Sequence, residues 1–439
     1  MVEIELKFQI SEARRTALLK ALDPKKSETI QLQAKYFDTP DRLLAQHGAA
    51  LRQRLEGTRW IQTLKAAGKS HLHRFEHNHN LGELESSPEL DLSIYQAIPE
   101  AQQILTQALG SDAAALKLTF ETDIQRTYRV IEFEDAEIEV CLDVGVVRAS
   151  GREQTIHEVE FELKSGSVQS LLAFSFEWVK KYQLWLDVRS KAEMGNLLAL
   201  EQTVSPARFE KEFVLSKKES AAHNLSLLIG QQMQHLLPNI AAISAGVAEQ
   251  SHIDQAQTAL EHLQLTLALF KDWNSNISDK WAMQLAAFKH QFDHLQHLQH
   301  MQSTLGAFLQ NPTTTENLAK DILYAQEKLG NLVKSTQNVH HYLELLTFSL
   351  SSHDQVQKQD LKTYAHNTLQ NQYRQLQESL NAADISHFES LDVLAQKIKE
   401  LKFSFPILTS IYDVKNLQKY SKALNDAQQA AHEYQILAT

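Results

Sequence analysis

Apolar and charged side chains alternate along much of the first 165 residues. Over residues 2–8 the apolar residues occupy the even positions, and Glu3, Glu5 and Lys7 occupy the odd ones. A period of two is typical of a β-strand with one apolar face and one charged face. The same period recurs over residues 51–55, 60–65, 71–80, 120–130, 136–144 and 157–164. Several such strands with mostly short connections predict an antiparallel sheet or barrel, interrupted by helices at about 11–22, 93–109 and 168–182.

The rest of the chain has the pattern of helices. Apolar residues recur at three- and four-residue spacing over 256–270, 280–298 and 361–380. Pro238, Pro312 and Pro406 mark expected helix breaks. Twelve of the 14 arginines, but only six of the 20 histidines, lie in the first 200 residues. This change predicts an α+β chain with one domain over 1–200, a linker over 201–216 that contains Pro206, and an α-helical domain over 217–439.

Composition excludes several classes of protein. No run of about 18 apolar residues is present, so we expect no membrane span. The net charge of −11 argues against a DNA-binding protein, which needs a basic face. A single cysteine, Cys141, excludes a disulfide framework and a cysteine-based zinc site. The acidic amino terminus does not resemble a signal peptide, so we expect a cytoplasmic protein.

On the charged faces of the predicted strands, basic and acidic residues both recur at alternate positions. Arg52 shares a face with Arg54, and acidic residues repeat at alternate positions over 137–143 and 158–162. The pattern alone leaves two interpretations open. These faces could be solvated surfaces with cross-strand ion pairs, or they could converge in the lumen of a barrel. A lumen with carboxylates for a hard divalent cation and cations for a polyanion would suit a metal-bound polyphosphate.

Several short motifs occur in a familiar order over residues 1–200. They are Glu3-Ile4-Glu5-Leu6-Lys7, Lys35-Tyr36-Phe37-Asp38-Thr39-Pro40, Ala50-Leu51-Arg52-Gln53-Arg54, Thr63-Leu64-Lys65, Arg74-Phe75-Glu76, Arg126, Leu142-Asp143-Val144-Gly145, Glu158-Val159-Glu160-Phe161-Glu162-Leu163-Lys164 and Ser190-Lys191. The first resembles the ExExK signature of the CYTH superfamily, the triphosphate tunnel metalloenzymes, and the others resemble further motifs of that family. One ExExK would be weak evidence, whereas this many ordered matches is specific.

The resemblance implies a closed, eight-stranded antiparallel β-tunnel that hydrolyses or transfers a triphosphate with Mg²⁺ or Mn²⁺. The implied metal ligands are Glu3, Glu5, Glu76, Asp143, Glu158 and Glu160. The implied phosphate-binding cations are Lys7, Arg52, Arg54, Lys65, Arg74, Arg126 and Lys191. One ion would bind the triphosphate oxygens, and a second, near Glu76 and Asp143, would orient and acidify a water molecule. Glu5, Lys7, Glu76 and Asp143 are the expected catalytic residues.

Inorganic triphosphate is the expected substrate, with pyrophosphate and phosphate as products. Hydrolysis of thiamine triphosphate, hydrolysis of nucleoside or RNA 5′-triphosphates, and class IV adenylyl cyclase activity are alternatives within the same family. A non-catalytic tunnel that binds polyphosphate is an alternative of a different class. The acidic residues favour the enzyme, because a protein that only binds a polyanion gains little from carboxylates in its lumen.

The helical half resembles the CHAD domain that follows the CYTH domain in bacterial inorganic triphosphatases. His252 stands where CHAD has the first residue of its arginine-rich helix, but Gln255, Glu261, His262 and Gln264 occupy that neighbourhood instead of arginines. The basic surface that polyphosphate binding requires is therefore largely missing. We interpret residues 217–439 as a degenerate CHAD-like bundle, which is compatible with a homodimer formed through this domain.

Overall fold

The structure is a computed structural model. It describes residues 2–68, 70, 72–110, 112–305, 312–351, 360–384, 386–412, 420, 422–427 and 429–430. The chain forms two compact units. The first contains Met1–Arg208, Leu236–Ala256 and Leu298–Glu344, and the second contains Phe209–His235, Gln257–His297 and Leu345–Thr439.

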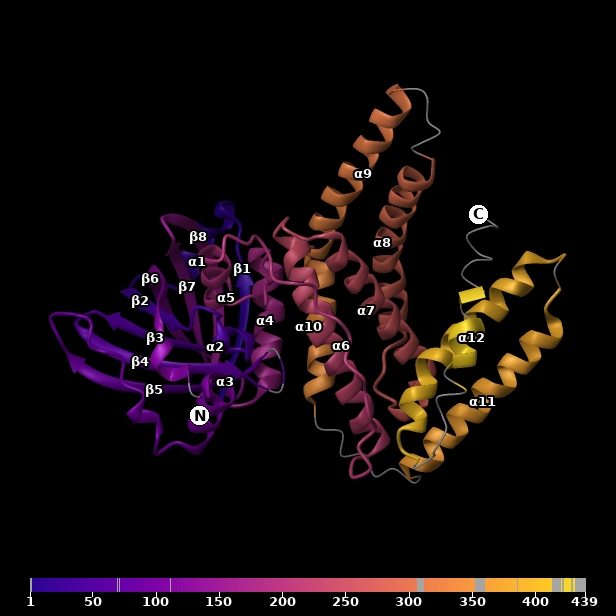
Figure 1. The fold of residues 1–439 in the computed structure, drawn as a ribbon, viewed down its shortest axis with the longest axis horizontal. Helices are drawn as coiled ribbons and strands as arrows, with labels where there is room; N and C mark the ends of the chain where they lie inside the picture. The colour runs from indigo at the N-terminus through magenta and orange to yellow at the C-terminus, as the bar shows by residue number, and fades with distance from the viewer. Residues whose placement is uncertain are drawn as a thin grey trace. The chain divides into compact units, whose positions relative to one another are not determined.

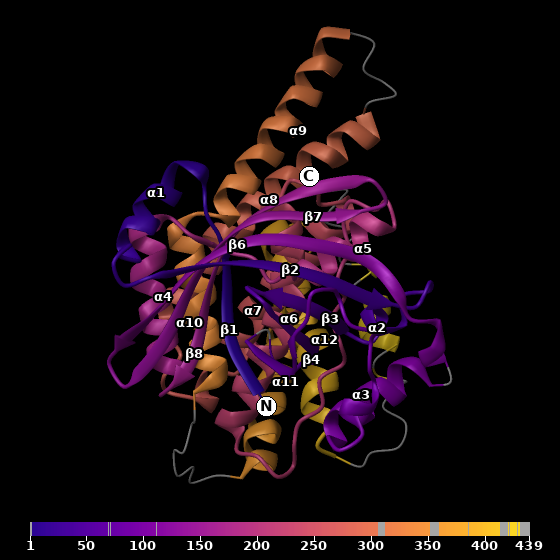
Figure 2. The ribbon, with the colours of Figure 1, turned by 90° about the vertical axis from the view of Figure 1, so that its left-hand side faces the viewer.

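The amino-terminal part of the first unit is an antiparallel barrel (Figures 1 and 2). Its strands are β1 (Val2–Gln9), β2 (Glu28–Asp38), β3 (Ala49–Glu56), β4 (Arg59–Ala67), β5 (His73–Glu83), β6 (Lys117–Phe133), β7 (Ala136–Ala149) and β8 (Arg152–Ser165). They pair in the order β5-β4-β3-β2-β6-β7-β8-β1, and β1 pairs again with β5 to close the barrel. A two-residue strand, β9 (Trp185–Leu186), is added to β1. The predicted eight-stranded antiparallel tunnel is confirmed.

Helices cover the outer face of the barrel. They are α1 (Glu12–Ala21), α2 (Leu43–Gln46), α3 (Pro99–Leu109) and α4 (Val168–Tyr182), with the 3₁₀ turns η1 (Ser93–Tyr95) and η2 (Asp112–Ala115). The apolar residues of β3, β4 and β5 form a buried cluster with α3 and η1. On the other side, Phe161 of β8 lies 5.2 Å from Phe174 of α4, measured between ring centroids. Because the apolar side chains of these two clusters point outward into the helices, the charged side chains that alternate with them point into the lumen.

One helix packs against the inner face. Residues of α5 (Lys191–Ala199) form a buried cluster with Phe120 of β6, Val147 of β7 and Ile156 of β8. Gly195 lies so close to Phe120 that an added Cβ would be 2.1 Å from the ring. The absence of a side chain at Gly195 therefore lets the helix lie against the strands. The first residue of this helix, Lys191, is thereby placed at the inner face of the barrel.

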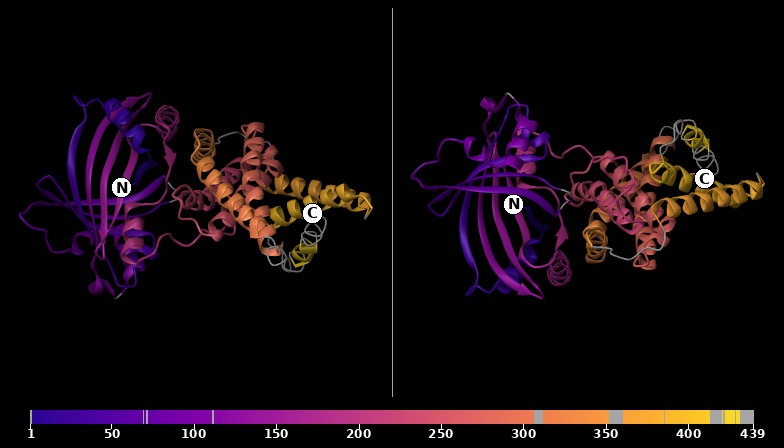
Figure 3. Two further views of the ribbon diagram at one scale, coloured as in Figure 1. Left: turned by 90° about the horizontal axis from the view of Figure 1, so that it is seen from above. Right: turned by 90° about the horizontal axis from the view of Figure 1, so that it is seen from below.

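The remaining elements are helical. They are α6 (Ala221–Ser244), α7 (Gln250–Leu269), η3 (Lys271–Trp273), α8 (Asp279–Leu305), α9 (Pro312–Val333), α10 (Thr336–Leu350), α11 (Leu361–Ala382) and α12 (Phe388–Thr409). Within the second unit α11 packs side by side with α12 (Figure 3). No helix in the described ranges is long and apolar enough to cross a membrane.

Several local predictions were wrong. Pro238 lies inside α6 and Pro406 inside α12, so neither breaks its helix, whereas Pro312 is the first residue of α9. Proline is tolerated at a helix start, and in α6 the buried neighbours Leu237 and Ile240 offset the lost backbone hydrogen bond. The helix predicted over 93–109 is divided into η1 and α3. The strand predicted over 71–80 begins at His73, and residue 71 lies outside the described residues.

Candidate functional site

Strand register aligns charged residues across the inner face of the barrel. Asp143 of β7 pairs with Arg126 of β6 on one side and with Glu158 of β8 on the other. Lys7 of β1 pairs with Glu160 of β8. Directly paired residues project to the same face of a sheet, so cations and carboxylates from four neighbouring strands share one side of the lumen.

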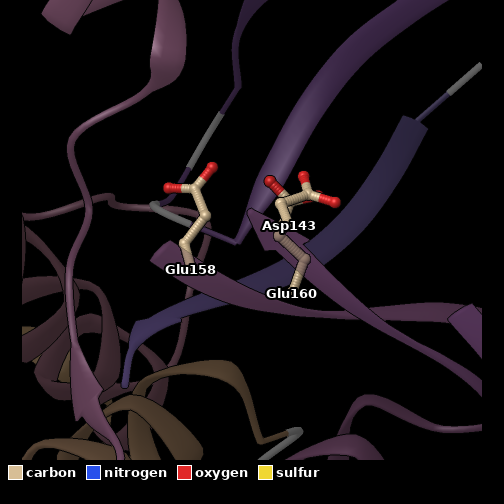
Figure 4. Close-up of side chains that lie close together, drawn as sticks. All are labelled: Asp143, Glu158 and Glu160. Carbon is tan, nitrogen blue, oxygen red and sulfur yellow. The ribbon is translucent and has the colours of Figure 1, made fainter. Parts of the chain in front are cut away.

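Three carboxylates on β7 and β8 form what we call the acidic cluster: Asp143, Glu158 and Glu160 (Figure 4). One oxygen of each lies within 4.8 Å of the others. The side chains of Asp143 and Glu158 are fully buried, and that of Glu160 is 14% exposed. Neither oxygen of Glu158 accepts a hydrogen bond from any residue that the structure describes. Buried oxygens without hydrogen-bond donors, grouped at this spacing, fit a hard divalent cation.

Cations surround the acidic cluster. Arg126 donates to Asp143 from Nε at 2.7 Å and from Nη2 at 2.6 Å, and Nη2 also reaches Glu160. The Nζ atom of Lys191 lies 2.8 Å from Asp143 Oδ2 and 2.8 Å from Glu160 Oε1, and it also contacts Glu158. Lys7 Nζ lies 3.9 Å from Glu158 Oε2 and donates to the carbonyl of Arg189. These cations offset the repulsion between the three carboxylates.

The protonation of these groups follows from the competition between burial and charge. Burial raises the pKa of Glu158, and attraction by Lys191 and Lys7 only partly offsets it. Burial also opposes ionisation of Asp143 and Glu160, but Arg126 and Lys191 outweigh it and lower the pKa of both carboxyls. Burial raises the pKa of the neighbouring Cys141 thiol well above its ordinary value. Cys141 therefore remains a neutral thiol and is unsuited to act as a nucleophile.

A second charged group lies on β1, β3, β4 and β5. Lys65 Nζ is 2.8 Å from Glu3 Oε2 and 2.9 Å from Glu76 Oε2. Arg74 Nη1 lies 3.2 Å from Glu5 Oε1, and Arg52 Nη2 lies 4.0 Å from Glu76 Oε1. The site thus contains a further set of three carboxylates, each paired with a cation of another strand.

Two carboxyls of this second group have opposite pKa shifts. Burial, together with the neighbouring charge of Glu5, raises the pKa of Glu3 to about 8, despite the attraction of Lys65. Burial opposes the ionisation of Glu76 as well, but Lys65, a hydrogen bond with Glu3 and Arg52 lower its pKa below the ordinary value. The hydrogen bond between these two carboxyls thus favours the proton on Glu3 and the negative charge on Glu76.

The thirteen site residues predicted from the sequence do not form one contact network. Arg126, Lys191, Lys7, Asp143, Glu158 and Glu160 gather on β6–β8, β1 and α5, whereas Glu3, Glu5, Arg52, Lys65, Arg74 and Glu76 gather on β1 and β3–β5. Arg54 pairs with Glu56 on its own strand. Among the residues that the structure describes, no group of three close metal-ligating side chains includes Glu76. A second ion between Glu76 and Asp143 remains a prediction.

Sequence reasoning missed two contributors to this lining. Tyr36 of β2 accepts a hydrogen bond from Arg52 Nη1 at 3.3 Å and stacks on Phe120, with 4.3 Å between ring centroids. Asp187 accepts hydrogen bonds from Arg189 Nε at 3.0 Å and from Arg189 Nη2 at 2.7 Å. These bonds order the segment whose carbonyl, that of Arg189, accepts a hydrogen bond from Lys7. Tyr36 lies within a quoted motif and could have been found by its inward phase, whereas Asp187 has no periodic signal.

Comparison with known proteins shows similarities to the barrel part of the chain. Residues 1–196 match the family model of the CYTH domain. An inorganic triphosphatase of Haemophilus influenzae is 33% identical over 227 residues, which are 50% of this chain and 62% of that protein. The chain thus spans less than two thirds of the length of this curated relative.

Solved structures give weaker similarities. A putative adenylate cyclase of Bacillus halodurans is 22% identical with a TM-score of 0.30, covering 41% of this chain and 89% of that one. A putative adenylyl cyclase of Hippeastrum, described as having a dominant triphosphatase activity, is 17% identical with a TM-score of 0.33. The match covers 46% of this chain and 97% of that one. The CHAD domain of Ricinus communis is 12% identical with a TM-score of 0.47, and the match covers 53% of this chain and 81% of that one. The residues matched by the CYTH family model include all the strands that carry the two charged groups.

Proposed function

We propose that the barrel hydrolyses inorganic triphosphate to pyrophosphate and phosphate with the help of Mg²⁺ or Mn²⁺. The observation that carries this proposal is the presence of grouped, buried carboxylates and of several cations on one inner face. The CYTH match and the inorganic triphosphatase of Haemophilus influenzae support the same activity. Phosphoryl transfer needs charge neutralisation and in-line geometry rather than a protein nucleophile, and the charged side chains of this lumen can supply the charge neutralisation.

We assign the acidic cluster to metal binding, together with Glu3, Glu5 and Glu76 as further ligands. Carboxylate oxygens are the donors that Mg²⁺ and Mn²⁺ prefer. When bound, such an ion neutralises phosphate oxygens and lowers the pKa of a coordinated water molecule. Glu158 supports this assignment, because its buried carboxylate has no hydrogen-bond donor in the described part of the chain and depends on a cation beside it, a position that Lys191 Nζ contacts in this structure.

We assign phosphate binding to the cations of the lumen. Arg52, Arg54, Arg74 and Arg126 each present a planar fork of donors that suits two phosphate oxygens, whereas Lys7, Lys65 and Lys191 act as point charges. Their charge would stabilise the negative charge that develops on the departing pyrophosphate. Glu76 keeps a negative charge beside Lys65, so its carboxylate can accept a hydrogen bond from an attacking water molecule.

The helical half has a supporting role in this proposal. We retain the division into a tunnel domain over 1–200, a linker over 201–216 and a CHAD-like domain over 217–439. With only two arginines after residue 200, polyphosphate binding by this domain has little electrostatic support. We propose instead that this domain positions the substrate or forms a homodimer.

The direct test is a parallel assay of phosphate release by the full chain. The substrates are inorganic triphosphate, ATP, thiamine triphosphate and long-chain polyphosphate, each with Mg²⁺, with Mn²⁺ and with chelator. We expect a strong preference for inorganic triphosphate that chelator abolishes. A preference for thiamine triphosphate or ATP would replace the proposed substrate but keep the enzyme class. Absence of metal-dependent release from all four substrates would overturn the proposal.

A further inference from the structure

The ammonium group of Lys191 lies at the centre of the acidic cluster. Its Nζ atom is 2.8 Å from Asp143 Oδ2 and 2.8 Å from Glu160 Oε1, and it also contacts Glu158. These are the three carboxylates whose oxygens lie close enough together to share one metal ion. The lysine therefore occupies the position that a cation bound by all three would need.

The helix that carries Lys191 is firmly held, but the lysine side chain is not rigid. Ser190 caps α5 by accepting a hydrogen bond from the amide of Glu193, and Gly195 packs directly against Phe120. The backbone at Lys191 is thereby fixed next to the cluster. A lysine side chain has four rotatable bonds, so its ammonium can move several ångströms while the helix stays in place.

Lys191 and a divalent cation cannot occupy the cluster together. Both are cations that would contact the same three oxygens, and like charges at a separation of a few ångströms repel strongly in a buried site. Without either cation, three buried carboxylates would repel one another. The cluster thus requires one cation at a time, and the chain itself supplies one.

We propose that Lys191 is a tethered counter-ion of the acidic cluster and competes with the divalent metal ion for it. Metal binding displaces the Lys191 ammonium from Asp143, Glu158 and Glu160. The displaced group is then free to bind a phosphate oxygen, so that metal and triphosphate favour each other's binding. This inference rests on the proposed function only in assuming that the cluster binds a divalent ion.

The test compares Mn²⁺ binding by three forms of the full chain, measured as loss of the free Mn²⁺ signal in electron paramagnetic resonance. The forms are the unaltered chain, Lys191→Met and Lys164→Met. Lys164 lies on β8 and pairs with Glu162 at 2.9 Å, outside the acidic cluster, so its substitution removes the same charge without opening the metal position. We expect Lys191→Met to lower the Kd for Mn²⁺ at least tenfold and Lys164→Met to change it less than twofold. Unchanged or weaker binding by Lys191→Met would overturn the competition.

A measurement on the unaltered chain covers the case in which Lys191→Met does not fold. Trace acetylation with acetic anhydride, followed by mass spectrometry, reports how accessible each lysine is to the reagent. Saturating Mg²⁺ should increase the labelling of Lys191 severalfold and leave that of Lys164 unchanged. Equal labelling of Lys191 with and without Mg²⁺ would show that the ammonium does not leave the cluster, and would overturn the proposal.

The two proposals fail in different ways. If the unaltered chain hydrolyses inorganic triphosphate but Lys191→Met binds Mn²⁺ no more tightly, the competition is wrong and the proposed function stands. If Lys191→Met binds Mn²⁺ more tightly but the unaltered chain releases no phosphate, the competition is right and the hydrolase assignment is wrong. If no form binds Mn²⁺ or Mg²⁺, both proposals are wrong.

Discussion

Arg126 and Asp143 form a two-pronged ion pair inside the barrel, with Nε 2.7 Å from Oδ1 and Nη2 2.6 Å from Oδ2. The side chain of Asp143 is fully buried, and that of Arg126 is 17% exposed. The pair lies directly across β6 and β7 in the strand register. The guanidinium of Arg126 therefore holds the Asp143 carboxylate of the acidic cluster in place, and its Nη2 atom also donates to Glu160.

Replacement of Arg126 should destabilise the barrel. Arg126→Gln leaves Asp143 with Lys191 as its remaining cationic partner among the described residues, and breaking a buried pair costs about 3–5 kcal/mol. Lys191 moderates that loss, so we expect about 2–3 kcal/mol in the free energy of unfolding, measured by urea denaturation. Arg126→Lys keeps the charge but loses the fork, and should cost less. Equal stability of Arg126→Gln and the unaltered chain would show that the pair contributes nothing to the fold.

The close approach of α5 to β6 depends on Gly195. In Gly195→Ala the new methyl group would meet the Phe120 ring at 2.1 Å, and overpacking of this kind costs about 1–3 kcal/mol. We expect a lower melting temperature and partial rescue by the added substitution Phe120→Leu. The control is Gly230→Ala in α6, where the nearest atom lies at 3.5 Å and alanine should be neutral or slightly stabilising. A Gly195→Ala variant as stable as Gly230→Ala would contradict the packing of α5 against the inner face.

Stability should fall with rising pH because of Glu3. Its pKa is raised by burial to about 8 in the folded chain, above the ordinary value of 4.5, so the folded state retains a proton that the unfolded state has lost. This contribution is fully present below about pH 4.5 and is lost between there and about pH 8, with a slope of up to about 1.4 kcal/mol per pH unit. Glu3→Gln mimics the protonated carboxyl and should flatten the melting-temperature profile over this range in the presence of chelator. An identical profile in Glu3→Gln would show that Glu3 does not retain the proton.

Loss of a predicted ligand should suppress turnover more than it affects folding. Glu5→Gln and Glu160→Gln each remove one carboxylate charge, and we expect the rate of triphosphate hydrolysis to fall by about 100-fold or more. Glu153→Gln is the matched control, because Glu153 is also on β8 but pairs with Arg148 on the outer surface. Near-normal turnover by Glu5→Gln would count heavily against the metal assignment.

Local periodicity predicted the strands because each has one face against apolar helices and one against charged side chains. The motifs that carry Arg52, Glu76 and Glu158 identified the lining residues through the family resemblance. Periodicity could not predict closure of the barrel, since pairing of β1 with β5 depends on contacts between segments about 70 residues apart.

The sequence also could not predict which cation pairs with which carboxylate. Lys191 comes from a helix rather than a strand, and its contact with Asp143, Glu158 and Glu160 arises only because α5 lies against the inner face. Proline also failed to predict a helix end, because the burial of its neighbours keeps α6 continuous through Pro238. In each case tertiary packing overrode a local signal.

The central claim is tested most directly by ³¹P nuclear magnetic resonance of inorganic triphosphate incubated with the full chain. With Mg²⁺ or Mn²⁺ we predict that pyrophosphate and phosphate appear in equal amounts, and that neither appears with chelator or with Glu160→Gln. Intact triphosphate after prolonged incubation with either metal ion, under conditions in which Glu153→Gln and the unaltered chain are both folded, would contradict the assignment of this tunnel as an inorganic triphosphatase.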